Sequence, residues 1–348
     1  MRYGIWTPLP LTVQPEPRLD AASVQLATHG RAGEPDLLLE FASDVLTRAE
    51  GYGFDLSLIA QRFLGNDPDC LMLGAALAAR TRTMHLMPAV YPGMITPQVV
   101  AKMGATLDRL SGGRFALNVV SGWFKEEFEI FSNGAWLDDE DAKYTRIEEF
   151  IAVLKGLWMN DTFSFEGRFY QLQNGRLPNR PAQVPHPPLY SASRTPRGKD
   201  IIARDCDIWF VPVQGGIDRY EENFAQVENE VADMTRRAAR YGRKLGYAIS
   251  CHVMCAPSTR AAYERGLALE AYGKENRLAF IAAKGLGAGL VGSPELIAER
   301  LQRYEALGVD TLMLHFHPMI EGLDVFGREV MPLMGAHSDS TRTLAVAS

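Results

Sequence analysis

Gly113-Arg114-Phe115-Ala116-Leu117-Asn118-Val119-Val120-Ser121-Gly122-Trp123 is the stretch that decides the fold. Its apolar centre, bounded by glycines, is typical of a strand that is buried on both faces. Asn118 interrupts the run, and a buried amide must find hydrogen-bond partners for its carbonyl oxygen and its N–H donors. The last three residues supply a hydroxyl, a backbone that a ligand can approach closely, and a flat ring. We therefore expect a strand end that faces a ligand, with a core strand and a satisfied asparagine as the alternative.

The composition favours a globular enzyme that acts on a small molecule. The chain has 348 residues, 47% of them hydrophobic, so it can bury a large core. Its net charge of −6 comes from interspersed acidic and basic residues, which gives no footprint for nucleic acid or an anionic membrane. The first residues pass directly into a strand-like run, and no stretch approaches transmembrane length. We therefore expect a cytoplasmic protein.

The cysteines do not predict a disulfide framework or a metal site. There are 4 of them, too few and too scattered for disulfides in a chain of this size. Cys251, His252 and Cys255 are spaced like metal ligands, but the alternation around them indicates a strand, and no second ligand cluster accompanies them. We expect small buried thiols and no bound metal.

Strand-like and helix-like segments alternate along the whole chain. We predict eight strands, near residues 3, 54, 84, 115, 189, 208, 247 and 312. The helices predicted between them cover residues 36–49, 71–79, 97–110, 143–158, 201–203, 218–241 and 294–307. This pattern predicts a single (β/α)8 TIM-barrel domain over residues 1–348. A doubly wound sheet is the alternative fold, weakened because no Gly-x-Gly-x-x-Gly follows an early strand.

Two segments do not fit the simple alternation. We expect an insertion at residues 160–188 that includes a hairpin with its turn at Glu166-Gly167. Residues 274–292 contain a run of small residues, three of them glycine, which is the composition of a mobile flap.

In such a barrel, the functional residues lie at the carboxyl ends of the strands. Polar and aromatic residues at those positions are more numerous than core packing needs. The residues expected around this mouth are Thr7, Gln61, Tyr91, Asn118 to Trp123, Ser193 to Thr195, Gln214, His252, His315 and His317. We expect only one of the last two histidines to belong to the site, and His317 is the candidate.

Several motifs together resemble those of a known family. They are Ser111-Gly112-Gly113-Arg114, Asn118 to Trp123 with the nearby Glu127, Lys143 to Arg146, Phe165-x-Gly167-x-Phe169-Tyr170, and Leu290 to Pro294. The chain resembles, over nearly its whole length, the bacterial luciferase-like flavin monooxygenases. Within them it is similar to the group of dimethylsulfone monooxygenase, alkanesulfonate monooxygenase and the pyrimidine oxygenase.

The resemblance implies a two-component, luciferase-like enzyme with reduced FMN (FMNH2) as its cofactor. A separate NAD(P)H:flavin reductase would supply the FMNH2, and O2 and a small organic substrate would be the other reactants. The chemistry belongs to the flavin, while the protein orients it and excludes water. The family usually forms homodimers or homotetramers.

The resemblance also implies which residues bind the cofactor. Ile59 and Ala60 match positions that line the flavin ring, Asn118 matches an amide that hydrogen-bonds it, and Glu127 matches a second polar contact. Ser121 is a further candidate from the strand end. The phosphate candidates are Lys143, Tyr144 and the turn Ser193, Arg194 and Thr195, which opens a helix. Here the chain departs from the family, because Ala192 and Ser193 replace the usual glycines.

The candidates for substrate and chemistry lie at the same mouth. His252 matches a family histidine, and Trp123 and Gln214 are the other catalytic candidates. Trp6, Lys284 and His317 are candidates for contacts with the substrate or from the flap. Ser250 stands where the sulfonate enzyme has an arginine, which favours a sulfone, a heterocycle or a halogenated aromatic over a sulfonate.

Two other functions remain open. A deazaflavin- or flavin-dependent hydride transfer on the same fold is one of them. A flavin-binding protein without catalysis is the other, and the polar residues retained at His252, Gln214 and the flap argue against it.

Overall fold

The computed structural model describes residues 1–7, 38–63, 68–122, 124–132, 135–275 and 284–335. Within these ranges, eight parallel strands close into a barrel, because each pairs with the next and β8 pairs with β9. The barrel strands are β1 (Arg2–Trp6), β2 (Leu56–Ile59), β3 (His85–Val90), β4 (Leu117–Val119), β7 (Leu189–Ser191), β8 (Ile208–Phe210), β9 (Gly246–Cys255) and β11 (Thr311–Phe316). The predicted TIM barrel is confirmed, and each strand lies within a few residues of its predicted position.

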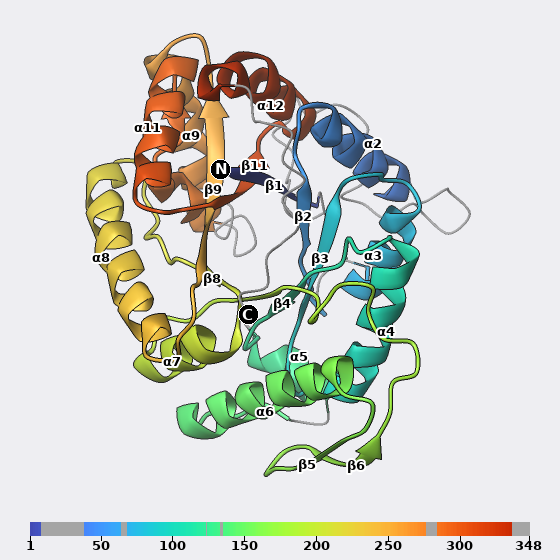
Figure 1. The fold of residues 1–348 in the computed structure, drawn as a ribbon. Coiled ribbons are helices and arrows are strands. Elements are labelled where there is room, and N and C mark those ends of the chain that lie inside the picture. Colours follow the sequence, from blue (N-terminus) through green and yellow to red (C-terminus); the bar gives the residue numbers. More distant parts are fainter. Residues whose placement is uncertain (8–37, 64–67, 123, 133–134, 276–283, 336–348) are drawn as a thin grey trace.

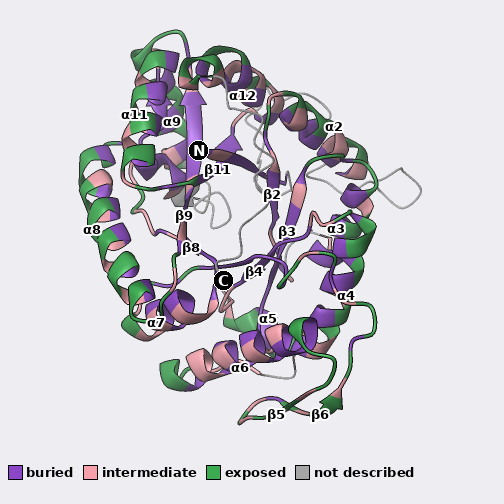
Figure 2. Ribbon diagram, viewed as in Figure 1, coloured by how far each residue is buried: buried purple, intermediate pink, exposed green. Residues whose placement is uncertain are grey.

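Helices form a ring around the barrel (Figure 1). The predicted ones are observed as α2 (Leu38–Gly51), α3 (Cys70–Ala78), α4 (Pro97–Leu110), α6 (Glu140–Met159), α7 (Pro196–Asp205), α8 (Tyr220–Ala239) and α11 (Pro294–Ala306). Three of them, α4, α7 and α11, begin with proline, whose fixed φ suits a first helical position. Their inner sides are buried and their outer sides are exposed (Figure 2).

Several short elements were not predicted. They are α5 (Lys125–Phe131), α9 (Thr259–Glu275), the 3₁₀ helix η1 (Gly285–Ala288), β10 (Val291–Gly292), α12 (Met319–Val325), and two further helical turns, η2 (Phe326–Val330) and η3 (Met331–Met334). Most lie around the end of β9 and after β11. All of them except α9, which has 17 residues, are short segments with few apolar positions, so their periodicity is weak.

Alternation along the strands separates the barrel interior from the layer beneath the helices. Leu58, Ala89, Ala116 and Met313 belong to a cluster inside the barrel, against which Trp6 and Val120 pack. Leu117 and Val119 instead join the large cluster shared with the helices. Asn118, which lies between them in β4, therefore faces the barrel interior.

A hairpin lies outside the ring of helices, near α4 and α6 (Figure 1). Its strands are β5 (Phe163–Glu166) and β6 (Gln171–Gly175), within the predicted insertion and with the turn after Glu166 as predicted. The carboxylate of Glu149 in α6 accepts hydrogen bonds from the backbone N–H groups of Arg168, Phe169 and Tyr170, at 2.7, 2.8 and 3.1 Å. A single buried carboxylate thus fixes the hairpin tip to the barrel.

In the ranges given above, no helix combines the length and the apolar character needed to cross a membrane.

Candidate active site

Two stacked imidazoles, a tilted indole and a serine form one wall at the mouth of the barrel. Trp6 ends β1, and its indole N–H donates a hydrogen bond to Ser250 Oγ on β9 at 3.1 Å. The imidazole of His315 on β11 lies 4.3 Å from the Trp6 ring and 5.8 Å from the His252 ring, to which it is nearly parallel at 6°. His252 and His315 are register partners on adjacent strands, which is why their rings stack. Two predicted residues, Trp6 and His252, are thus brought together.

His315 is the histidine of the last strand that enters the barrel. It is 5% exposed. Burial, and then the charge of Arg62, lowers its pKa to about 3, so the ring is neutral at physiological pH. The strand ends at Phe316, and His317, the sequence candidate, follows it as a half-buried residue. The expectation that His317 rather than His315 joins the site is therefore not supported. Residues two apart share a face of a strand, so the interior position of Met313 was the signal for His315.

The end of β4 presents a buried amide. Asn118 is 6% exposed, and among the described residues no group hydrogen-bonds its Oδ1 atom. Ser121 is half-buried at the same strand end. Gly122 has φ +86° and lies against the ring of Phe128, so a side chain there would be strained and would collide with that ring. The predicted strand, buried on both faces, is observed, and its asparagine retains an unused acceptor.

Glu127 lies close to this region on α5. It is 1% exposed, and its Oε1 accepts a hydrogen bond from the backbone N–H of Phe63 at 2.9 Å. The side-chain Oε1 of Gln61 accepts a hydrogen bond from the backbone N–H of Cys70 at 2.8 Å. The backbone carbonyl of Gln61 accepts one from the hydroxyl of Tyr91. These bonds hold the segment after β2 in place beside the mouth.

The turn Ser193–Thr195 lies at the N-terminus of α7 and is held by hydrogen bonds. Thr195 is the N-cap of α7, and its Oγ1 accepts from Gly198 N at 3.2 Å. The Tyr144 hydroxyl lies 2.8 Å from Ser193 Oγ, so two predicted phosphate ligands are in contact. Arg194 is exposed and donates to the Val213 carbonyl at 3.2 Å, and within the described chain it forms no ion pair.

Lys284 lies beside this turn. Lys284 packs against Gly215, because a Cβ added to that glycine would lie 3.5 Å from both its Cα and its Cγ. Arg194 donates its hydrogen bond to Val213 in the same loop. Burial, followed by the charge of Arg194, lowers the pKa of Lys284. The sequence predicts contacts of this lysine with the flap and the substrate, whereas in the structure it lies close enough to Arg194, a phosphate candidate, to feel its charge.

The described part of the predicted flap is tightly packed. η1 is buried, and a Cβ on Gly285 would come within 2.7 Å of the backbone N of His252. Asn223 Nδ2 donates to the Gly287 carbonyl at 2.8 Å. These glycines permit close backbone contact, a role that their composition did not predict. Residues 276–283 lie outside the described residues, so the closing motion of the flap stays a prediction.

Two other candidates have side chains that contact residues outside the predicted site. The ammonium of Lys143 lies 5.0 Å from the centre of the Trp136 ring. The side-chain amide of Gln214 is exposed and bonded to Gln226 and Arg219, at 3.0 and 3.1 Å. Their roles remain predictions without support from these contacts.

The two candidates in β2 lie on its outer side or at its edge. Ile59 is fully buried, and its Cδ1 faces Gly74 of α3, so its side chain is not available to a ligand inside the barrel. Ala60 is half-buried. Trp123 lies outside the described residues.

The histidine and cysteines of β9 point to opposite sides. Cys251 belongs to the cluster shared with the helices, whereas His252 stacks on His315 inside the barrel. Within the described ranges, no group of three His, Cys, Asp or Glu side chains is arranged to hold a metal ion. The metal-like spacing therefore does not produce a common site for these residues.

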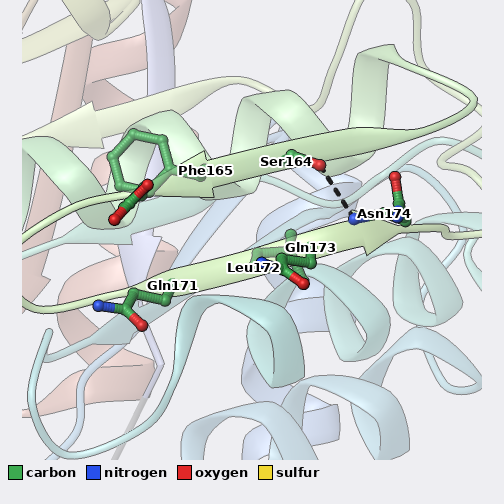
Figure 3. A pocket seen from close by; sticks show the side chains of 7 residues that line it. Ser164, Phe165, Gln171, Leu172, Gln173 and Asn174 are labelled. Atoms are coloured by element: carbon green, nitrogen blue, oxygen red, sulfur yellow. Dashed lines mark hydrogen bonds between the residues drawn. The ribbon is translucent and has the colours of Figure 1, made fainter.

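One pocket, of about 730 Å³, lies on the hairpin rather than at the barrel mouth (Figure 3). Its lining comes from β5 and β6, and Asn174 N donates to Ser164 Oγ across it at 2.9 Å. None of the predicted site residues contributes to this pocket.

The comparisons with known proteins identify the family. The model of the luciferase-like monooxygenase family matches residues 22–311. The chain belongs to the luciferase-like monooxygenase family. This membership confirms the family predicted from the strand end and its accompanying motifs.

Two curated luciferase-like relatives are similar over most of the chain. They are FMNH2-dependent dimethylsulfone monooxygenases of Pseudomonas putida and Pseudomonas fluorescens (strain Pf0-1). The first is 31% identical, covering 86% of this chain and 88% of the relative. The second is 29% identical, and the match covers 86% of this chain and 89% of the relative.

Solved structures share the luciferase-like fold. The monooxygenase RslO1 from Streptomyces bottropensis has a TM-score of 0.74 at 22% identity, covering 95% of this chain and 99% of that one. An F420-dependent secondary alcohol dehydrogenase has a TM-score of 0.73 at 16% identity, covering 96% and 99%. Because both give the same fold likeness, the fold alone does not distinguish oxygenation from hydride transfer.

Proposed function

We propose that this chain oxygenates a small organic molecule with FMNH2 and O2, and that a separate NAD(P)H:flavin reductase supplies the FMNH2. Both curated relatives are named FMNH2-dependent monooxygenases, so reduced FMN and the flavin-dependent monooxygenase class are confirmed as predicted. Their names also support a sulfone, with dimethylsulfone as the first compound to test. In the balanced reaction, substrate, O2 and FMNH2 become oxygenated product, water and FMN.

The observation that carries the proposal is the amide of Asn118. A buried carbonyl oxygen without a partner is unfavourable, and a ligand with an N–H group relieves it. The flavin ring has such a group, and β4 presents Asn118 toward the barrel interior. The residues present therefore fit the ring of FMN.

The turn before α7 fits the other end of the cofactor. Ser193, Thr195 and the hydroxyl of Tyr144 offer donors in one place, and Arg194 and Lys284 add positive charge. Helix N-termini and arginine favour phosphate. We assign the FMN phosphate to this turn.

Reduced FMN, held by these residues, would supply the chemistry that activates O2 for oxygenation of the substrate. The chain itself orients the cofactor through Asn118 and the turn, and its apolar barrel interior excludes water. The wall of Trp6, His315 and His252 limits the space in which a substrate lies. A homodimer or homotetramer and a cytoplasmic location are further parts of the proposal.

The test is an anaerobic titration of the protein with reduced FMN, followed by mixing with O2 with and without dimethylsulfone. Tight binding, with loss of the sulfone coupled to O2 consumption, is the expected result. Binding of a reduced deazaflavin in place of FMNH2 would instead indicate hydride transfer. Binding of FMNH2 with no oxygenation of any sulfone, heterocycle or halogenated aromatic would indicate a flavin-binding protein without this activity.

A further inference from the structure

We propose that His315 is a substrate-binding residue whose neutral imidazole donates a hydrogen bond to an oxygen atom of an uncharged substrate, such as a sulfonyl oxygen. The inference rests on the proposed function and specifies the substrate class of the same site. It follows from how the ring is held, from its hydrogen bonding and from its charge.

The ring of His315 is held between two others. Trp6 lies against it with a centroid distance of 4.3 Å and an interplanar angle of 31°. His252 lies 5.8 Å away at 6°. The indole of Trp6 is fixed in turn by its hydrogen bond to Ser250. Because β11 lies between β1 and β9, Trp6 and His252 flank the imidazole on its two sides, and its edge, which carries both nitrogen atoms, is the part most available to a ligand.

The nitrogen atoms of His315 have unused hydrogen-bonding capacity. In the described part of the chain, no group makes a hydrogen bond with either of them, although the residue is only 5% exposed. A neutral imidazole has one N–H donor and one acceptor nitrogen. The ring edge makes no hydrogen bond within the described chain and its nitrogen atoms are not completely buried, so a ligand in the candidate active site can reach it.

The side chains that form this wall carry no charge of their own, and Arg62 is a nearby cation outside it. Burial and the nearby charge of Arg62 keep the pKa of His315 at about 3, so the ring provides a donor without a positive charge. Arg62 already has a partner of its own. Ser250 and Trp6, which complete the wall, are uncharged. An anion would lose its hydration here and gain no counter-charge from the stack.

The experiment measures binding rather than turnover. Anaerobic protein saturated with reduced FMN is titrated with dimethylsulfone, or with methanesulfonate as the anion of similar size, and the methyl signal is followed by NMR. We expect the wild type to bind the sulfone at least about tenfold more tightly than the sulfonate. His315→Phe, which keeps a stacked ring without a donor, should weaken sulfone binding about tenfold. His315→Asn should retain more of the affinity than His315→Phe.

His85→Phe is the matched control. His85 is another histidine with a low pKa on a barrel strand, but it begins β3 at the opposite end of the barrel and contacts the Asp55 carbonyl at 3.1 Å. This variant should bind the sulfone as the wild type does. The affinity for reduced FMN and the thermal unfolding of each variant report whether it has folded.

Wild-type sulfone affinity in His315→Phe would overturn the inference, as would a wild type that prefers the sulfonate or binds neither compound. Those results would leave FMNH2 binding and O2 consumption, the tests of the proposed function, unaffected. If His315→Phe does not fold, the sulfone affinities of His315→Gln and His315→Met are compared instead. The two side chains are similar in length, but only glutamine has a hydrogen-bond donor. Equal sulfone binding by these two variants would also refute the inference.

Discussion

At the scale of single residues, two buried asparagines show the difference between a structural amide and a ligand-binding one. Asn223 accepts from Gln214 N at 2.7 Å and donates to the carbonyls of Gln214 and Gly287, at 3.0 and 2.8 Å. Asn118 is nearly as buried, yet its Oδ1 has no partner among the described residues. Satisfied amides stabilise a fold, whereas an unsatisfied one lowers stability until a ligand binds.

We predict that Asn118→Ala weakens reduced-FMN binding by about 1 kcal/mol or more, because the flavin ring loses a hydrogen bond. The stability of the unliganded protein should change little, since no contact within the described chain is lost at Oδ1. Anaerobic fluorescence titration and urea unfolding measure the two effects. Asn223→Ala is the control, with an expected loss of about 1–3 kcal/mol in the free energy of unfolding. Unchanged FMN affinity in Asn118→Ala would remove this residue from the cofactor site.

We predict that Arg194→Ala weakens the binding of FMN but not that of riboflavin, which has no phosphate. A charged hydrogen bond contributes about 1.5–3 kcal/mol, so FMN affinity should fall at least about tenfold. Arg260→Ala is a control, because Arg260 is paired with Glu264 on the exposed side of α9. Equal losses for FMN and riboflavin would contradict a phosphate contact.

Sequence reasoning identified some of these residues for sound physical reasons. Asn118 stands out because a polar residue interrupts an apolar strand, whereas the Ser193 turn was predicted from its resemblance to a phosphate-binding turn that opens a helix. The sequence could not decide correctly between His315 and His317, because it does not show where the last strand ends. The contact of Lys284 with the Gly215 loop was also beyond reach, because it joins segments about 70 residues apart in the chain.

At the scale of elements, the repeating strand and helix units were predictable and the short packed segments were not. The α4 helix has a proline at its start, apolar residues on one side and glycines after its end, so local signals fix it. The glycines of η1 instead serve contacts with β9 and with the loop after β8. Composition alone cannot distinguish flexible glycines from closely packed ones.

We predict that Gly287→Ala lowers the free energy of unfolding by about 1–3 kcal/mol, as overpacking in a core does. Its Cβ would collide with the backbone carbonyl of Gln214 and come within 2.9 Å of Asn223 Nδ2. A backbone atom cannot rotate away, so the loop itself must move. Urea unfolding measures the change.

Gly51→Ala is the matched control for this substitution. Gly51 ends α2, and a Cβ there would meet no atom within 4 Å. We expect its free energy of unfolding to stay the same or rise slightly, because alanine favours the helix. If Gly287→Ala were as stable as Gly51→Ala, η1 would be adaptable, as a mobile flap requires.

At the scale of the whole molecule, the two ends of the barrel differ in their chemistry. Charged pairs gather where the strands begin: Arg2 bonds Asp55 at 2.6 Å, and Arg243 bonds the buried Asp207 at 2.9 Å. The neutral ring stack and the amide of Asn118 lie where the strands end. In barrels of this kind the first end serves stability and the second serves chemistry. Composition predicted an enzyme, but only the closed barrel shows how these tasks are separated.

We predict that His85 makes the stability of the protein depend on pH. Burial, and next the charge of Arg2, lowers the pKa of His85 in the folded state to about 4, against about 6.5 in the unfolded chain. As the pH falls from about 6.5 to about 4, the unfolded chain binds a proton that the folded one does not. The free energy of unfolding therefore falls over this window, by up to about 1.4 kcal/mol per pH unit. Above about pH 6.5 the contribution of His85 to stability is fully present.

His85→Gln should remove this contribution, because glutamine does not titrate. Urea unfolding of both proteins between pH 4 and pH 8 is the measurement, and other titrating groups, His315 among them, cancel in the difference between the two curves. The difference between the two free energies of unfolding should be constant above about pH 7. As the pH falls below that, the wild type should lose stability relative to the variant. Parallel curves over the whole range would mean that the folded state protonates His85 as easily as the unfolded chain does. The end of the barrel where the strands begin would then be more open to water than the contacts of His85 with Asp55 indicate.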